Sequence, residues 1–357
     1  MGQNNIEEMR QVYNWLCDDE SRDIYMKRLS FLVSGEYHYM SDVISSYVQD
    51  LAVLNEKAIP ELLESIPKNR KFYLYGAGMD ARINLHWVSG DPRFAGFCDR
   101  NSEKQSGGVD GWPVFPPEKL LEDRESSIVI ATHSGYESIQ KNLKELGIDS
   151  NRVFLLSPYL FKEQEDKYFN PNFMTFNPEG EVLVDCGSCD LANAIQMSKH
   201  CDVSYVYAFE PDPENAQVCR TRAEQYFKGR AEIIEKGSWS QTTTLSFSAP
   251  SDVEGVYIRV EEDGSNSVAV TTIDEVVNEN RKVTYIKMDI EGSELEALKG
   301  AQHTIRRDHP KLGICIYHKP EDMTELPMYI MSLYPGYHLY LRHHSNGEGE
   351  TVLYAMP

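Results

Sequence analysis

Acidic side chains and a histidine follow two apolar segments in the C-terminal half of the chain. The segment YIKMDIEG places Asp289 and Glu291 two residues apart after one apolar run, and GICIYHK places His318 after the next. In open α/β sheets, ligands bind beyond the carboxyl ends of the strands, which is where such residues meet. We interpret Asp289, Glu291 and His318 as catalytic residues of one crevice. The alternative for Glu291 and Glu294 is a stabilising charge at the N-terminus of the following helix.

A second group of residues suits a ligand that contains adenosine. VLVDCGS ends in Asp185, Gly187 and Ser188. Gly187 lets the backbone approach a ligand closely, and Asp185 can accept hydrogen bonds from an ammonium group or from loop amides. The segment lacks the third glycine of a dinucleotide fingerprint, with Leu191 near its place. It therefore favours a phosphate-free adenosyl ligand over a pyrophosphate.

The next two strand ends extend this ligand site. The segment AFEP places Glu210 25 residues after Asp185, where its carboxylate can accept hydrogen bonds from both ribose hydroxyls. The alternative is that Glu210 is a stabilising charge at the N-terminus of the helix that begins at PDPEN. GSW ends the third strand, where its backbone and ring can lie beside an adenine; the alternative is a buried tryptophan. We predict these cofactor-binding residues: Asp185, Gly187, Ser188, Glu210, Pro211, Ser238, Trp239 and Asp289.

The elements that position these residues predict an α/β fold of the Rossmann-like type over residues 179–357. We expect strands at EVLVDCGS, SYVYAFEP, AEIIEKGSW, VTYIKMDI, KLGICIYH, YHLYLRHHS and ETVLYAMP. Helical segments between most of the first five, including SELEALKGAQHTIRRDH, predict a parallel sheet. Turn residues between the last two strands predict a β-hairpin. The expected sheet is therefore seven-stranded and mostly parallel, and it ends in an antiparallel hairpin.

Three further segments precede this domain. Residues 1–66 are predicted to be helical, residues 67–160 to form a smaller Rossmann-like α/β lobe, and residues 161–178 to be a connector rich in aromatic residues and proline. The strands of the lobe are KFYLYGAG, FAGFCDR, SSIVIATHSG and NRVFLL. The helical segment suits structural packing or a docking role, so a homo-oligomer is one alternative.

The smaller lobe contains a glycine pattern of its own. Gly76 and Gly78 follow its first strand, and Asp99 ends its second, about 20 residues further on. This spacing resembles a dinucleotide fingerprint, in which phosphate lies at a helix N-terminus and a carboxylate binds ribose hydroxyls. One interpretation is a nucleotide or nucleotide-sugar bound by Gly76, Gly78 and Asp99. The other is a structural or regulatory lobe.

Composition and charge restrict the partners of the protein. The 357 residues include 35 basic and 56 acidic side chains, a formal net charge of −21. Such a surface repels phosphate backbones, so we expect no nucleic-acid partner. No apolar stretch approaches the roughly 18 residues of a membrane span, and the N-terminus lacks the pattern of a secretory signal. Together with seven scattered cysteines, these features predict a cytoplasmic protein without a membrane partner.

The motifs above resemble the FkbM-type methyltransferase family. The resemblance is carried by VLVDCGS, YAFEPDPEN, TTIDEV and YIKMDIEGSELEALKGA, and it covers about residues 170–357. It implies S-adenosylmethionine as cofactor and O-methyl transfer onto a sugar, glycan or natural product. It also implies Asp185 and Gly187 at the methionine end, Glu210 on the ribose and Asp289 near the methyl group. The smaller lobe is weakly similar to nucleotide-sugar-binding domains that precede some sugar acetyltransferases.

Methyl transfer to a hydroxyl requires a base within hydrogen-bond reach. We expect His318 or Asp289 to be this base, and Glu291 to orient the base or a sugar hydroxyl. A divalent ion on these three residues is the alternative, although we expect no metal. Other interpretations are an N- or protein-directed methyltransferase and a non-catalytic nucleotide-sugar-binding protein. The last is favoured by the loop at residues 188–191, which departs from the family's pattern of small residues and glycine.

Overall fold

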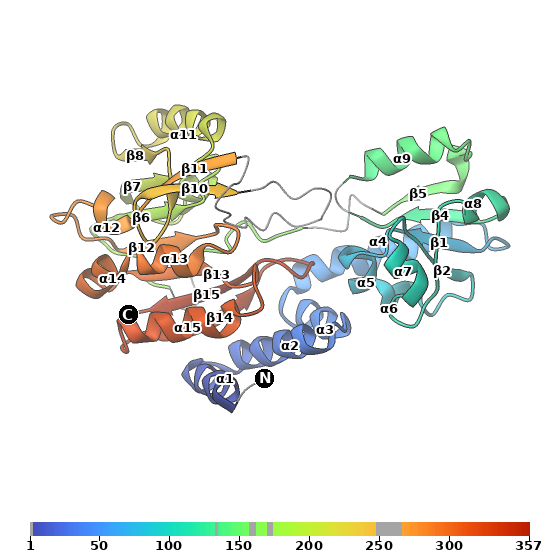
Figure 1. Ribbon diagram of the computed structural model, residues 1–357, viewed down its shortest axis with the longest axis horizontal. Coiled ribbons are helices and arrows are strands. Elements are labelled where there is room, and N and C mark those ends of the chain that lie inside the picture. Colours follow the sequence, from blue (N-terminus) through green and yellow to red (C-terminus); the bar gives the residue numbers. More distant parts are fainter. Residues whose placement is uncertain (1–2, 133–134, 157–161, 170–173, 248–265) are drawn as a thin grey trace. The chain divides into compact units, whose positions relative to one another are not determined.

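The computed structural model describes residues 3–132, 135–156, 162–169, 174–247 and 266–357 (Figure 1). The chain divides into two compact units. The first contains Met1–Tyr25, Glu165–Arg342 and Thr351–Pro357, and the second contains Met26–Gln164 and His343–Glu350. No helix in the described ranges is long and apolar enough to cross a bilayer.

The first unit is built on a seven-stranded sheet in the order β14-β15-β13-β12-β6-β7-β8. The strands are β6 (Glu181–Cys186), β7 (Val203–Phe209), β8 (Ala231–Ile234), β12 (Tyr285–Met288), β13 (Lys311–Cys315), β14 (His338–His343) and β15 (Thr351–Met356). The first five pair in parallel, and β15 pairs antiparallel with β13. The central strands β6, β12 and β13 are buried along their whole length, as expected for parallel strands with both faces covered. The predicted fold class is confirmed.

Helices cover this sheet in two groups. Helices α10 (Ala192–Met197) and α11 (Pro213–Tyr226) contribute to the same buried cluster as Leu183 and Tyr285 of the strands. The other group comprises α12 (Ile273–Val276), α13 (Glu294–Lys299), α14 (Gln302–Asp308) and α15 (Asp322–Leu333), which pack on one another.

The predicted helix over residues 293–309 is interrupted. Helix α13 ends at Lys299 and α14 begins at Gln302. Gly300, the first of the two residues between them, lies so close to the backbone of Trp239 that a Cβ atom on it would be 2.0 Å from the Trp239 carbonyl oxygen. The absence of a side chain at Gly300 therefore permits the close approach of two backbone segments.

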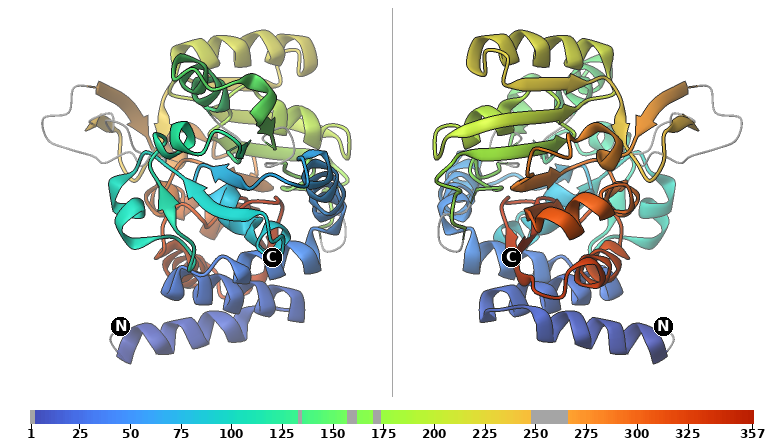
Figure 2. Two further views of the ribbon diagram at one scale, coloured as in Figure 1. Left: turned by 90° about the vertical axis from the view of Figure 1, so that its right-hand side faces the viewer. Right: turned by 90° about the vertical axis from the view of Figure 1, so that its left-hand side faces the viewer.

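A separate three-stranded sheet was not predicted. It contains β9 (Gly237–Ser238), β10 (Thr243–Phe247) and β11 (Asn266–Thr271) in the order β10-β11-β9. Figure 2 shows β10 and β11 extending away from the seven-stranded sheet. The third strand of the large sheet therefore ends at Ile234, and Gly237–Ser238 pairs in parallel with β11 instead.

The N-terminal residues complete the first unit. Helix α1 (Gln3–Trp15) packs against α15, and α2 (Asp19–Ser34) begins in this unit. Between them, the Cys17 amide donates to the Leu339 carbonyl at 2.9 Å, and Leu16 forms a parallel bridge with Leu339. The Ser21 hydroxyl accepts from the Leu341 amide at 2.9 Å. These bonds cover the edge of β14, which would otherwise expose unpaired backbone groups.

The second unit contains a five-stranded parallel sheet in the order β3-β2-β1-β4-β5. Its strands are β1 (Phe72–Tyr75), β2 (Phe94–Cys98), β3 (Val114–Phe115), β4 (Ser127–Ile130) and β5 (Val153–Leu155). Its helices are α3 (His38–Tyr47), α4 (Gln49–Ser65), α5 (Met79–Ile83), α6 (Leu85–Val88), α7 (Ser102–Gly107), α8 (Lys119–Glu122), α9 (Tyr136–Glu145) and the 3-10 turn Ser150–Arg152. The predicted smaller Rossmann-like lobe is present.

Candidate functional site

A buried ion pair lies beneath the carboxyl edge of the large sheet. Asp185 and Lys287 are directly opposite one another on the neighbouring strands β6 and β12, and both are essentially inaccessible to solvent. The Lys287 Nζ atom lies 3.1 Å from Asp185 Oδ1 and donates to the carbonyls of Gly187 at 2.8 Å and Cys186 at 3.2 Å. Burial alone would lower the pKa of Lys287, but the nearby carboxylates raise it. The ammonium group that Asp185 faces is therefore that of a charged lysine.

The loop after β6 turns directly over this pair. Gly187 has a φ of +77°, and a Cβ atom on it would lie 2.0 Å from the backbone oxygen of Asp289. The amides of Gly187 and Ser188 both donate to the Phe209 carbonyl at 3.1 Å. Ser188 is buried, and its hydroxyl donates to the Asp185 carbonyl at 3.1 Å. Glycine is thus required where the loops after β6 and β12 touch.

Glu210 holds the same loop from the end of β7. Its carboxylate accepts the Cys189 amide at 2.7 Å and the Asp212 amide at 2.9 Å, while Pro211 beside it is exposed. Burial is the largest influence on this carboxyl and raises its pKa, although the two amides act in the opposite direction. A carboxylate has about four acceptor positions, so the two amides and the Asn215 side chain leave room for a hydroxyl donor. This geometry is compatible with the ribose contact predicted for Glu210.

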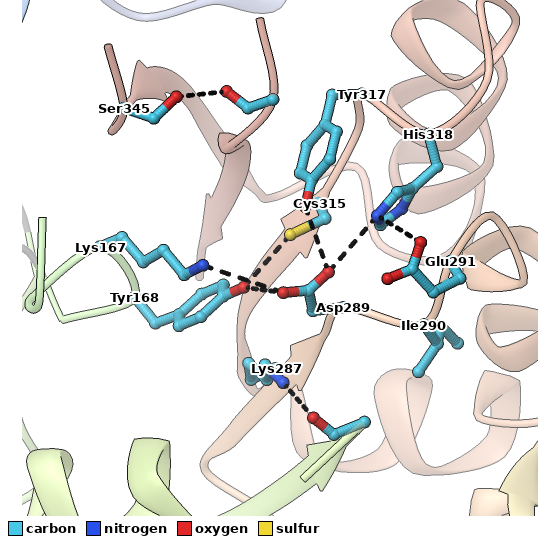
Figure 3. Close-up of polar contacts among 12 residues, drawn as sticks. Lys167, Tyr168, Lys287, Asp289, Ile290, Glu291, Cys315, Tyr317, His318 and Ser345 are labelled. Atoms are coloured by element: carbon cyan, nitrogen blue, oxygen red, sulfur yellow. Dashed lines mark hydrogen bonds and ion pairs between the residues drawn. The ribbon is translucent and has the colours of Figure 1, made fainter. Parts of the chain in front are cut away.

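Asp289 follows β12 and collects donors from distant parts of the chain (Figure 3). Its Oδ2 atom accepts the Tyr168 hydroxyl at 2.8 Å and lies 3.9 Å from Lys167 Nζ. Its Oδ1 atom accepts the Tyr317 hydroxyl at 3.5 Å and lies 3.5 Å from His318 Nε2. Burial alone would raise the pKa of Asp289, but the surrounding cations hold it below its usual value. Asp289 is therefore ionised at neutral pH.

His318 follows β13, the strand beside β12, and the residue is 6% exposed. Its Nδ1 atom lies 2.9 Å from Glu294 Oε1, and its Nε2 atom lies 3.5 Å from Asp289 Oδ1 and 3.8 Å from Glu291 Oε2 (Figure 3). Burial alone would lower the pKa of His318, but the hydrogen bond to Glu294 and the charges of Asp289 and Glu291 raise it to about 9. The three predicted catalytic residues are thus close together.

Glu291 lies in a tight turn after β12. It has a φ of +55°, and Gly292 after it has a φ of +89°. Left-handed backbone is unusual for glutamate and marks a turn held by its surroundings. The Glu291 side chain is more than half exposed, and burial of the remainder raises its pKa. Glu291 therefore presents a carboxylate to solvent at the mouth of the cluster.

The remaining predicted cofactor residues, Ser238 and Trp239, lie on or after β9 rather than at the end of a strand of the large sheet. Ser238 is buried, and the Trp239 amide donates to the Thr271 carbonyl at 2.9 Å in the small sheet. They are thus fixed by the three-stranded sheet, while Asp185, Gly187 and Glu210 share the loop after β6.

In the second unit, the predicted acid Asp99 makes hydrogen bonds to the backbone of the glycine-containing turn itself. The Asp99 carboxylate accepts the amides of Ala77 at 2.8 Å and Asn101 at 2.9 Å, and it lies 3.5 Å from Lys104 Nζ. Gly76 has a φ of +101°, and Gly78 caps the five-residue helix α5. In this structure, Asp99 stabilises the turn between β1 and α5.

Sequence reasoning missed Lys287, Lys167, Tyr168 and Tyr317. A signal for Lys287 exists, since a lysine within the apolar run YIKM must bury its charge beside an acid. Tyr168 has no comparable signal, because it lies 121 residues from Asp289 in sequence. Within the described residues, no three His, Cys, Asp or Glu side chains converge in a way that would hold a metal ion.

A known family model covers the part of the chain that contains Asp185, Glu210, Asp289 and His318. Residues 185–343 match the family model described as the methyltransferase FkbM domain. No curated protein matches the sequence significantly.

Among solved structures, the chain is similar to a methyltransferase FkbM from Methylobacillus flagellatus KT. The identity is 19%, the TM-score is 0.49, and 87% of this chain and 100% of the other are covered. It is also similar to an rRNA methylase from Streptococcus thermophilus, with 13% identity, a TM-score of 0.32, and 50% and 88% covered. A third similar structure is TrmK from M. capricolum in complex with S-adenosyl-homocysteine, with 12% identity, a TM-score of 0.29, and 50% and 63% covered.

Proposed function

We propose that this chain transfers a methyl group from S-adenosylmethionine to a hydroxyl group of a sugar, glycan or natural product, because residues 185–343 match the family model of the methyltransferase FkbM domain. The observation that carries the proposal is the cluster at the carboxyl edge of β12 and β13. There, the carboxylates of Asp289 and Glu291 both lie within 4 Å of His318 Nε2, beside the loop that Gly187 and Glu210 shape.

The charges of this edge suit a cationic ligand that lacks phosphate. Four carboxylates, those of Glu210, Asp289, Glu291 and Glu294, lie on the loops after β7 and β12 or at the start of α13. Such an arrangement attracts a sulfonium and an ammonium group and repels a pyrophosphate. S-Adenosylmethionine supplies a methyl group that is already activated by its sulfonium. The protein must therefore orient the acceptor hydroxyl and accept its proton.

Residues at the methionine and ribose ends follow from the same geometry. Gly187 has no side chain where the loop after β6 meets the backbone of Asp289, and this close contact holds the loop at the sheet edge, where the methionine end of the cofactor would lie. Glu210 retains acceptor capacity for ribose hydroxyls beside its two loop amides. Asp289 supplies a permanent negative charge near the reacting groups, since its pKa lies below the usual value.

His318 is the better of the two candidate bases. A carboxylate with a lowered pKa, such as Asp289, is a weak proton acceptor. A histidine whose pKa is raised to about 9 is a strong acceptor once it is neutral, and the hydroxyl proton then goes to its Nε2 atom. Glu291 lies 3.8 Å from the same nitrogen and orients the ring or an acceptor hydroxyl.

The first test is direct binding of the cofactor. Titration calorimetry with S-adenosylmethionine and S-adenosylhomocysteine should show binding of both to the full chain. Glu210→Gln should weaken binding by about 1.5–3 kcal/mol, roughly 10- to 150-fold, as expected for a lost charge-assisted contact. Glu214→Gln, an exposed change on the first turn of α11, is the matched control and should bind as the wild type does.

The second test is a screen of acceptors with radiolabelled cofactor. Sugars, glycans and hydroxylated natural products are compared with peptides and amines under the same conditions. Label in a hydroxyl acceptor supports the proposal. Absence of cofactor binding would overturn it, and label found only in amines or peptides would overturn the O-methyl assignment.

A further inference from the structure

The first residue of α13 is buried although it carries a charge. Glu294 has no solvent-accessible surface, and its Oε1 atom accepts the Ile290 amide at 2.9 Å and faces His318 Nδ1 at 2.9 Å. An acidic residue in the first turn of a helix normally gains its stabilisation while exposed. Burial of a carboxylate is costly unless specific donors satisfy it. The position of Glu294 therefore calls for a partner such as the imidazole of His318.

The other ring nitrogen of His318 points in the opposite direction, toward the cluster. Within the described part of the chain, Nε2 makes no hydrogen bond, although the residue is 94% buried. Its neighbours are the carboxylates of Asp289 at 3.5 Å and Glu291 at 3.8 Å, which Figure 3 shows on the same side of the ring. A nearly buried nitrogen without a hydrogen bond is an available position for a ligand hydroxyl.

A hydrogen bond at one ring nitrogen determines the state of the other. When Nδ1 donates its proton to a carboxylate, the neutral ring has its lone pair on Nε2. A buried carboxylate in this position also fixes the orientation of the ring and stabilises the imidazolium that forms after proton transfer. Glu294 has the required contact with His318 Nδ1, and its second oxygen, Oε2, makes no hydrogen bond in the ranges that the structure describes.

We propose that Glu294 is a positioning residue that holds His318 Nδ1–H, so that Nε2 is directed at the acceptor hydroxyl as a proton acceptor. The inference rests on the proposed methyl transfer, because it assigns the base of that reaction. In the step itself, the acceptor oxygen loses its proton to Nε2 and keeps the electron pair of the O–H bond. The ring becomes an imidazolium, and Glu294 remains an ionised carboxylate throughout.

Several other charges surround His318 and must be separated from the effect of Glu294. They are Asp289 and Glu291 on the loop after β12, Asp322 on α15, and Lys319 next in sequence, together with the titratable but neutral hydroxyl of Tyr317. Asp322 is buried, and burial followed by the charge of Glu294 raises its pKa to about 7. In the described structure, these acids make no hydrogen bond to the ring, whereas Glu294 does.

The test measures the titration and tautomer of His318 without any acceptor. The full chain is labelled with 15N-histidine, and His318→Gln identifies the signal. In the wild type, His318 should titrate near pH 9, and its neutral form should carry the proton on Nδ1. Glu294→Gln keeps an acceptor oxygen but removes the charge, so the pKa should fall by at least one unit, a tenfold loss of proton affinity.

The matched control is Glu296→Gln on the same helix, where the carboxylate accepts from Ser240 and lies beside Lys299. This variant should leave the titration of His318 unchanged. The assignment would be overturned if the pKa of His318 in Glu294→Gln stayed within about 0.3 of a unit of the wild-type value, roughly twofold in proton affinity. So would a neutral ring with its proton on Nε2.

Kinetics with a methylated acceptor provide a second readout. The acidic limb of kcat/KM should move to lower pH in Glu294→Gln by the same amount as the His318 titration, and Glu296→Gln should follow the wild type. A uniform loss of rate without movement of the limb would indicate that Glu294 only stabilises the fold. Failure of the chain to bind S-adenosylmethionine in calorimetry would instead overturn the proposed function, even with an intact Glu294–His318 contact.

Discussion

Replacing Lys287 with methionine should destabilise the first unit strongly. The side chain is 1% exposed and lies opposite Asp185, which is 0% exposed, so the substitution leaves a buried carboxylate without its cation. It also removes two hydrogen bonds to loop carbonyls. Removal of one partner of a buried pair costs about 3–5 kcal/mol, because the remaining charge stays desolvated. Native-state hydrogen exchange of the β6 and β12 amides should show a loss of this size.

Two comparison variants test this reasoning. Lys299→Met removes a partner from a partly exposed pair with Glu296, where about 0–1 kcal/mol is expected. Adding Asp185→Asn to Lys287→Met should recover most of the loss, since neither side chain is then charged. Two results would refute the idea that the isolated charge of Asp185 causes most of the destabilisation. One is a loss of less than about 1 kcal/mol in the free energy of unfolding of Lys287→Met, and the other is a double variant as unstable as the single one.

Two further predictions concern backbone space and pH. Gly187→Ala should lower the melting temperature and abolish cofactor binding in calorimetry, because its Cβ would lie 2.0 Å from the Asp289 carbonyl oxygen. Gly229→Ala is the control, since Gly229 has a similar φ of +81° but a Cβ there would have nothing within 4 Å. This variant should lose only the roughly 1–2 kcal/mol of stability that a left-handed backbone costs an alanine. Asp322→Asn should stabilise the protein by on the order of 2–4 kcal/mol at pH 8 but little below pH 4 in urea unfolding. Burial raises the folded pKa of Asp322 to about 7, so the wild type loses stability as pH rises from about 4 through 7, and the uncharged asparagine does not. An equal gain at both pH values would contradict this origin.

The sequence predicted the parts of the site that depend on neighbouring parallel strands. Asp289 and His318 follow adjacent apolar strands, and the sheet brings them within 3.5 Å. Glu210 follows β7 beside β6, and its carboxylate contacts the Cys189 amide of the β6 loop. In each instance, a buried strand with a polar residue at its carboxyl end was sufficient, because parallel strands end at a common edge.

The parts that sequence reasoning missed depend on long-range packing. The Tyr168 hydroxyl reaches Asp289 because the Tyr168 carbonyl accepts the Tyr285 hydroxyl at 2.6 Å and Gly313 leaves room for that ring. No local pattern encodes such a contact. Strand β9 of the three-stranded sheet was missed because it has only two residues, too few for an alternating pattern.

The pairing of Leu16 and Cys17 with Leu339 has a consequence for biosynthesis. Residues 338–342 of β14 are translated more than 300 residues after this segment. The segment therefore lacks its native partner while the intervening residues are made, although domains otherwise tend to fold as they emerge. Assembly of the first unit therefore requires residues 16–17 to pair with a strand that is synthesised much later.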